Sequence, residues 1–203
     1  MLQIAAAGFL TGLSLIVAIG AQNAFILRLG LMRAHVGIAV AICAASDALL
    51  IIVGTAGMGA LVQSHKSVLR VVAWVGAVYL LYFAFNALKR VFKTESLSAA
   101  ETNVMSKKAV VLSVLGFTWL NPHVYLDTVL LVGSIGSQFG TDRWWFALGA
   151  SFASLIWFVA LGYGSKAAAR VMAKPITWRI LDIFIAAIMA IIAISLVKTA
   201  LSS

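Results

Sequence analysis

The sequence predicts an all-α integral membrane protein with six transmembrane helices, and three observations lead to this class. Of its 203 residues, 63% are hydrophobic and only 10% are charged, whereas soluble domains carry about 25% charged residues. Six apolar segments approach or exceed the ~20 residues that a spanning helix needs. They occur at roughly 4–27, 36–62, 68–88, 109–135, 144–164 and 180–197. One polar connection, at 89–108, divides them into three plus three.

The first segment contains the first of two expected helix breaks. It opens with MLQI and no basic residue, and its apolar run exceeds the ~7–15 residues of a signal-peptide core. We therefore expect a membrane span here rather than a cleaved signal. Gln22 and Asn23 follow Gly20 in its second half, and their amides can cap freed backbone groups or contact a ligand.

The second segment carries a carboxylate near its centre. Asp47 lies within the run AASDALL, and a charge in the middle of the bilayer costs at least ~2.5–3.5 kcal/mol on insertion scales. A hydroxyl group, the backbone of a broken helix, a proton or a bound cation could compensate this cost. Asp47 is therefore either a structural hydrogen-bond acceptor or part of a site.

The fourth segment contains the strongest break signal, Asn121-Pro122-His123, followed by Asp127. Proline removes a backbone hydrogen bond and clashes with the preceding turn. In lipid, the freed carbonyl groups need partners inside the protein or in a wet cavity. His123 and Asp127 are four residues apart, so they could also pair with each other on one helix face. Segments 1 and 4 are predicted to be discontinuous.

The other segments are apolar, and their special residues indicate packing. Asp182 lies near the start of the sixth segment beside Arg179, which predicts a surface ion pair. Small residues let membrane helices approach closely and would also permit a homodimer. The glycines expected to do so are Gly8, Gly12, Gly54, Gly57, Gly59, Gly133 and Gly136.

The basic residues predict the orientation in the membrane. With six spans, the first, third and fifth connections share one face and hold 11 of the 15 Lys and Arg residues, against 4 for the other face. Cytoplasmic loops carry such an excess, so both termini are expected outside the cytoplasm. The net charge of +9 is then a signal of topology and of anionic lipid. Nucleic-acid binding is not expected, because the charges are spread over short loops.

The division into three plus three predicts one transporter domain, 1–203, built from two inverted repeats. Repeat one covers about 1–88, a charged cytoplasmic linker about 89–108, and repeat two about 109–203. QNAFIL at 22–27 is weakly similar to PHVYLD at 122–127, and ASDAL at 45–49 aligns with FASLI at 152–156. An odd number of spans per half makes the halves inverted, and such transporters hold their sites on broken helices near the midplane.

The expected spans hold acids but no strong base, since every Lys and Arg falls at a span end or in a loop. Asp47 and Asp127 can then be protonated, pair with His123, or bind a cation from outside, which suits proton-coupled transport of a cationic solute. A broken helix also directs its N-terminal dipole end at an anion, such as the carboxylate of an amino acid. The predicted site residues are Gln22, Asn23, Asp47, Asn121, His123 and Asp127, with Pro122 as the helix break.

Signals of an enzyme, a metal site or a cofactor are missing from the sequence. It has no His-Glu-x-x-His spacing, no phosphate loop and no Gly-x-Ser-x-Gly elbow. A single cysteine, Cys43, excludes an internal disulfide and a thiolate metal cluster. We expect no catalytic residues, no metal and no cofactor, so that any uphill transport must use an ion gradient or a partner.

Three motifs resemble the LysE family of amino-acid exporters, most closely its lysine/arginine branch. They are GAQNAF at 20–25, SDALL at 46–50 and WLNPHVYLD at 119–127, and the resemblance extends over all six segments. It implies export of L-lysine or L-arginine across the bacterial inner membrane, driven by the membrane potential or a proton gradient. The family's paired aspartates correspond to Asp47 and Asp127, and its amide motif to Gln22 and Asn23. Ala21 stands where many relatives have proline, so the first break is expected to be less sharp.

Three functions fit the sequence. An exporter of basic amino acids would use Asp47 and Asp127 for the side-chain cation or the coupling proton, and the amides for the α-amino and α-carboxylate groups. The same fold could export a neutral amino acid or a metal cation. A membrane scaffold subunit would instead need Asp47 for its abundance or its assembly with a partner.

Overall fold

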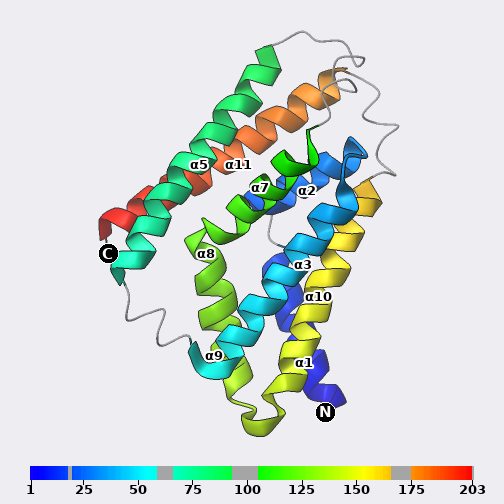
Figure 1. The fold of residues 1–203 in the computed structure, drawn as a ribbon, viewed down its shortest axis with the longest axis vertical. Helices are drawn as coiled ribbons and strands as arrows, with labels where there is room; N and C mark the ends of the chain where they lie inside the picture. The colour runs from blue at the N-terminus through cyan, green and yellow to red at the C-terminus, as the bar shows by residue number, and fades with distance from the viewer. Residues whose placement is uncertain (18–19, 59–65, 93–104, 166–174, 203) are drawn as a thin grey trace.

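The computed structural model describes residues 1–17, 20–58, 66–92, 105–165 and 175–202, and every regular element within these ranges is helical. Four helices are long and apolar enough to cross a membrane, or up to six if each of two bent helix pairs forms one span. The predicted all-α class with several membrane helices is therefore confirmed. Figure 1 shows the helices as an elongated bundle.

Four spans are unbroken by a sharp bend. They are α3 (Val36–Val53) with the π-helical turn η1 (Gly54–Met58), α5 (Lys66–Phe92), α10 (Arg143–Gly164) and α11 (Pro175–Ser202). The helix α5 continues past the expected end at residue 88, so Lys89 and Arg90 are helical rather than part of a linker. The end of the second expected span, 59–62, and linker residues 93–104 lie outside the described residues.

Two further segments are each divided into helices that meet at a large angle. The pair α1 (Leu2–Ile16) and α2 (Ala21–Leu31) is bent by 84°. The helix α7 (Lys107–Trp119) meets the segment 122–137 at 57°. That segment consists of α8 (Pro122–Val124), the π-helix η2 (Tyr125–Val132) and α9 (Gly133–Ser137), and the 3-10 turn η3 (Gly140–Asp142) leads on to α10.

Both predicted discontinuities are therefore present, but the expectation that the first would be less sharp is wrong. Gly20 precedes α2 in an extended conformation, with φ −111° and ψ −179°. The bend is thus present without proline at position 21, and residues 18–19 within it lie outside the described residues.

Glycines bring the helices into close contact. The helix α1 packs along α10, where a side chain at Gly8 would collide with the backbone of Phe146, and one at Gly149 with the backbone of Ala5. Gly54 of η1 lies against Gly133 of α9 and the backbone of Val129. Figure 1 also shows α5 lying along α11, and α3 along α10. Glycines 8, 54 and 133 have the packing role that was predicted for them.

Asp182 does not form the surface pair that was expected with Arg179. It is only 4% exposed, and its carboxylate accepts hydrogen bonds from Arg28 of α2 and Arg90 of α5. Arg179, one helical turn before it, is exposed. Arg28 lies in the last turn of α2, at a helix end as the sequence predicts, where α2, α5 and α11 converge around this acid.

The close approach of α1 and α10 predicts unequal effects of two glycine substitutions in α10. We expect Gly149→Ala to lower the free energy of unfolding by about 1–3 kcal/mol, because the new Cβ meets a backbone carbonyl. Gly164→Ala has open space and should be neutral or stabilising by up to about 1 kcal/mol. Unfolding of both purified variants in detergent checks this, and equal unfolding free energies would contradict the packing.

Candidate functional site

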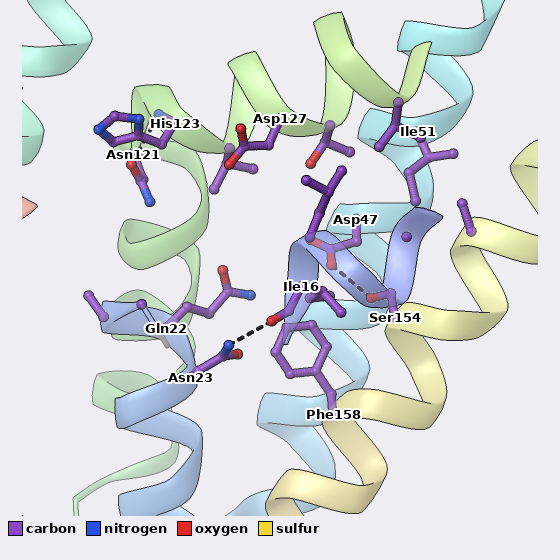
Figure 2. Close-up of a pocket in the computed structure, with 18 of the residues that line it drawn as sticks. Ile16, Gln22, Asn23, Asp47, Ile51, Asn121, His123, Asp127, Ser154 and Phe158 are labelled. Atoms are coloured by element: carbon purple, nitrogen blue, oxygen red, sulfur yellow. Dashed lines mark hydrogen bonds between the residues drawn. The ribbon is translucent and has the colours of Figure 1, made fainter. Parts of the chain in front are cut away.

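A cavity of about 270 Å³ lies between the two bent segments, α3 and α10. All six residues predicted for the site line it, as Figure 2 shows: Gln22, Asn23, Asp47, Asn121, His123 and Asp127. The helix break Pro122 is not part of the lining and is buried at the first position of α8. Two helix interruptions that are distant in sequence therefore border one cavity.

Asn23 supports the break in the first segment. Its Nδ2 donates to the carbonyl oxygen of Ile16, the last residue of α1, over 2.8 Å. Its Oδ1 accepts from the indole Nε1 of Trp157 on α10, over 3.3 Å. The Ile16 carbonyl freed by the break thus has a hydrogen-bond partner. The Asn23 side chain that provides it is held in place by Trp157 of α10.

Gln22, the preceding residue, faces the cavity differently. Figure 2 shows its amide extending toward the middle of the cavity. The Nε2 atom is buried and has no hydrogen-bond partner within the described residues. Gln22 also lies in the first turn of α2, whose N-terminus carries no side-chain cap. The Gln22 amide, the first backbone N–H groups of α2 and the positive end of the α2 dipole therefore lie close together.

Side chains next to the second break satisfy its backbone as well. Asn121 accepts from the backbone N–H of His123 over 3.1 Å and so caps α8. The hydroxyl of Tyr125 donates to the carbonyl oxygen of Trp119, the last residue of α7, over 2.8 Å. The indole of Trp119 in turn donates to Ser46 over 3.3 Å, which ties the break to the residue before Asp47.

The two carboxylates have different surroundings. Asp47 is 8% exposed, and its Oδ2 accepts from the hydroxyl of Ser154 on α10 over 2.7 Å. Asp127 on η2 is exposed, and within the described residues its carboxylate makes no hydrogen bond. Of the two acids, only Asp47 is therefore buried within the protein.

His123 and Asp127 do not form the private pair that was one alternative. The imidazole Nε2 lies 3.4 Å from the hydroxyl of Ser195 on α11, and no ion pair joins His123 to Asp127 in the described residues. The chain changes from α-helix to π-helix between them. The imidazole and the carboxylate still interact electrostatically.

The cavity combines groups suited to opposite charges. Among the described residues, its lining contains two carboxylates but neither lysine nor arginine, while Gln22 and the start of α2 offer donors. Such a site can hold a cation and a carboxylate of the same solute. Among the described residues there is no group of three or more His, Cys, Asp or Glu side chains that could hold a metal ion.

Sequence reasoning missed several side chains that complete the cavity. Ser154 is the hydrogen-bond donor to Asp47, and Thr128 and Phe158 also line the space. Only Ser154 had a signal, because it falls opposite Asp47 when 45–49 is aligned with 152–156. Ser195, which approaches His123, lies in an apolar helix and gave none.

Apolar helices with a polar cavity at two helix breaks have the arrangement of a membrane transporter. The profile of the LysE type translocator family matches residues 13–199, and the chain belongs to this family.

Relatives support this assignment over the whole chain. The chain is 41% identical to the lysine exporter LysE of Corynebacterium diphtheriae, over 97% of this chain and 99% of that protein. It is 38% identical to a protein of Mycobacterium tuberculosis named as a candidate amino-acid transporter, over 92% of this chain and 93% of that protein. No solved structure shows a significant match.

The hydrogen bond across the second break predicts a specific cost for removing one hydroxyl group. We expect Tyr125→Phe to lower the free energy of unfolding by about 1–3 kcal/mol, because the Trp119 carbonyl loses its partner. Tyr82→Phe is the matched control, since Tyr82 is 63% exposed. Unfolding of both variants in detergent or bicelles measures the difference, and equal stabilities would show that this carbonyl needs no cap.

Proposed function

We propose that this protein is a secondary active exporter of basic L-amino acids, L-arginine or L-lysine, in the bacterial inner membrane. The observation that carries the proposal is a cavity lined by Asp47 and Asp127, with neither lysine nor arginine among the described residues that line it. Membership of the LysE type translocator family and the relative named as a lysine exporter support the same substrate class.

The cavity provides one group for each charged part of such a substrate. Asp47 and Asp127 would bind the ammonium or guanidinium group of the side chain. The unpartnered Nε2 of Gln22 and the uncapped start of α2 would bind the α-carboxylate. Asn23 and Asn121 would hold the two breaks in place rather than bind the substrate directly, because both are engaged with the backbone.

The charge of the substrate indicates antiport with protons. Moving one positive charge out of a cell against the membrane potential costs about 2.3 kcal/mol per 100 mV. Protons that move inward on the same carboxylates would offset this cost. Asp47 and Asp127 would therefore carry a proton in one half of the cycle and the amino-acid cation in the other.

The inverted-repeat architecture belongs to this proposal. Three features support it: both helix breaks line one cavity, α5 lies along α11, and Ser154 donates to Asp47. In the alignment of the two halves, Ser154 of α10 is the counterpart of Asp47 of α3. If two equivalent helices are inverted relative to each other, their equivalent positions meet at the point where the helices cross. If each bent helix pair forms one span, the chain has six spans, and both termini lie outside the cytoplasm. The homodimer remains a prediction.

Replacing either cavity acid should reduce export. In proteoliposomes with a set pH gradient and potential, we expect Asp47→Asn and Asp127→Asn each to lower efflux of labelled arginine or lysine by about tenfold or more, because a charge-assisted bond to the cation is lost. Asp142→Asn, an acid in η3 outside the cavity, is the matched control and should export normally.

Competition in the same vesicles separates this proposal from its alternatives. An excess of arginine or lysine should block efflux of the labelled substrate, while threonine and divalent metal ions should not. Export at the normal rate by both cavity variants would refute the assigned roles. A normal rate together with lower abundance of Asp47→Asn would instead favour a scaffold subunit.

A further inference from the structure

A second cavity, of about 420 Å³, lies between α2, α5, α7 and α11. It shares no lining residue with the first cavity. Arg28, Asn86 and Arg90 supply its polar lining at one end, whereas aromatic and aliphatic side chains form most of the rest. The proposed export mechanism does not use this cavity, and the inference below does not rest on that mechanism.

The polar end of this cavity carries an excess of positive charge. Arg28 donates to Oδ1 of Asp182, and the Nε and Nη2 of Arg90 donate to the same oxygen over 3.1 and 3.0 Å. One carboxylate therefore serves two guanidinium groups, and none of the described residues that line the cavity is acidic. The guanidinium of Arg28 also lies 5.8 Å from the ring of Trp178, which adds no negative charge.

An excess charge of this kind calls for an anion. The side chain of Arg28 is 15% exposed and that of Arg90 is 39% exposed, so the one positive charge in excess of the Asp182 carboxylate lies in a partly buried place, which is costly. Guanidinium groups have donors in a planar fork that matches the oxygen atoms of phosphate. Within the described residues, only three of their N–H donors form hydrogen bonds, all to the same oxygen of Asp182.

The cavity opens toward the lipid rather than only toward water. Tyr82 of α5 and Leu112 of α7 line it and are 63% and 59% exposed. Both helices are apolar, and Phe85 and Leu88 on α5 are also exposed. A ligand that fits this opening has a charged head and an apolar chain.

Both arginines lie in the last turns of their helices, the part of a membrane helix that we expect beside the lipid headgroups. Arg28 is in the last turn of α2 and Arg90 in the last turn of α5, while the cavity also touches Met105, just before α7. Figure 1 places these helix ends together at the upper end of the bundle. Among the described residues, most of the basic side chains lie at this end, where anionic lipid is attracted.

We propose that this cavity binds one anionic phospholipid. Arg28 and Arg90 hold the phosphate of the headgroup, and an acyl chain lies in the apolar part beside Tyr82, Phe83 and Leu112. Inorganic phosphate has the same charged group without an acyl chain. Comparing the two ligands therefore distinguishes a lipid site from a phosphate site.

Native mass spectrometry of the purified full chain in detergent tests the proposal. Phosphatidylglycerol, phosphatidylcholine and inorganic phosphate are titrated separately. We expect one phosphatidylglycerol molecule to bind at least about tenfold more tightly than phosphatidylcholine, and Arg90→Gln to remove about tenfold of that affinity. Arg179→Gln is the matched control, because Arg179 is exposed at the same end of the bundle and does not line the cavity.

A second variant keeps the test valid if Arg90→Gln folds poorly. Asp182→Asn removes the only carboxylate shared by the two arginines, so it should tighten phosphatidylglycerol binding, whereas general damage to the fold would weaken it. Three results would each overturn the proposal. They are an equal loss of phosphatidylglycerol affinity in the Arg90 and Arg179 variants, equal affinities for the two lipids, and displacement of phosphatidylglycerol by inorganic phosphate at the concentration of the lipid.

Discussion

The carbonyl groups freed at the two helix breaks impose the constraint on which the rest of the structure depends. An unpaired backbone group in the hydrocarbon region costs several kcal/mol. The carbonyls of Ile16 and Trp119 avoid this cost by accepting from Asn23 and Tyr125. Each cap lies six or seven residues after the carbonyl that it serves, so each break carries its own partner in the adjoining sequence.

Satisfying the backbone locally leaves other polar groups free for a solute. Asn23 is engaged by Ile16 and Trp157, whereas its neighbour Gln22 has a donor without a partner and faces the cavity. Asp47 accepts a hydrogen bond from the hydroxyl of Ser154, and no arginine or lysine in the described part of the lining neutralises it. The cavity thus has carboxylates in one part and hydrogen-bond donors in another. This arrangement suits a solute that carries a carboxylate and more than one positive charge.

The helix spans, both breaks and the membership of the cavity could be predicted from the sequence because their signals are local. Hydrophobic length predicts a span, and proline, glycine and amides within it predict a break. The arginine pair on Asp182 could not be predicted in this way, since Arg28 lies 154 residues from its partner in sequence. The exposure of Asp127 and the contact of His123 with Ser195 also depend on packing between distant helices and on a π-helical turn.

Substrate protection of one engineered cysteine tests the central claim, that the cavity binds the basic amino acid itself. The chain has a single cysteine, Cys43, which is buried. In a Cys43→Ser background, Thr128→Cys places a thiol in the cavity lining, and Thr141→Cys places one on the exposed turn η3. The account predicts that lysine slows thiol labelling at position 128 much more than norleucine, which lacks the side-chain ammonium, and changes nothing at position 141. Equal labelling rates at position 128 with lysine, with norleucine and without either would contradict it.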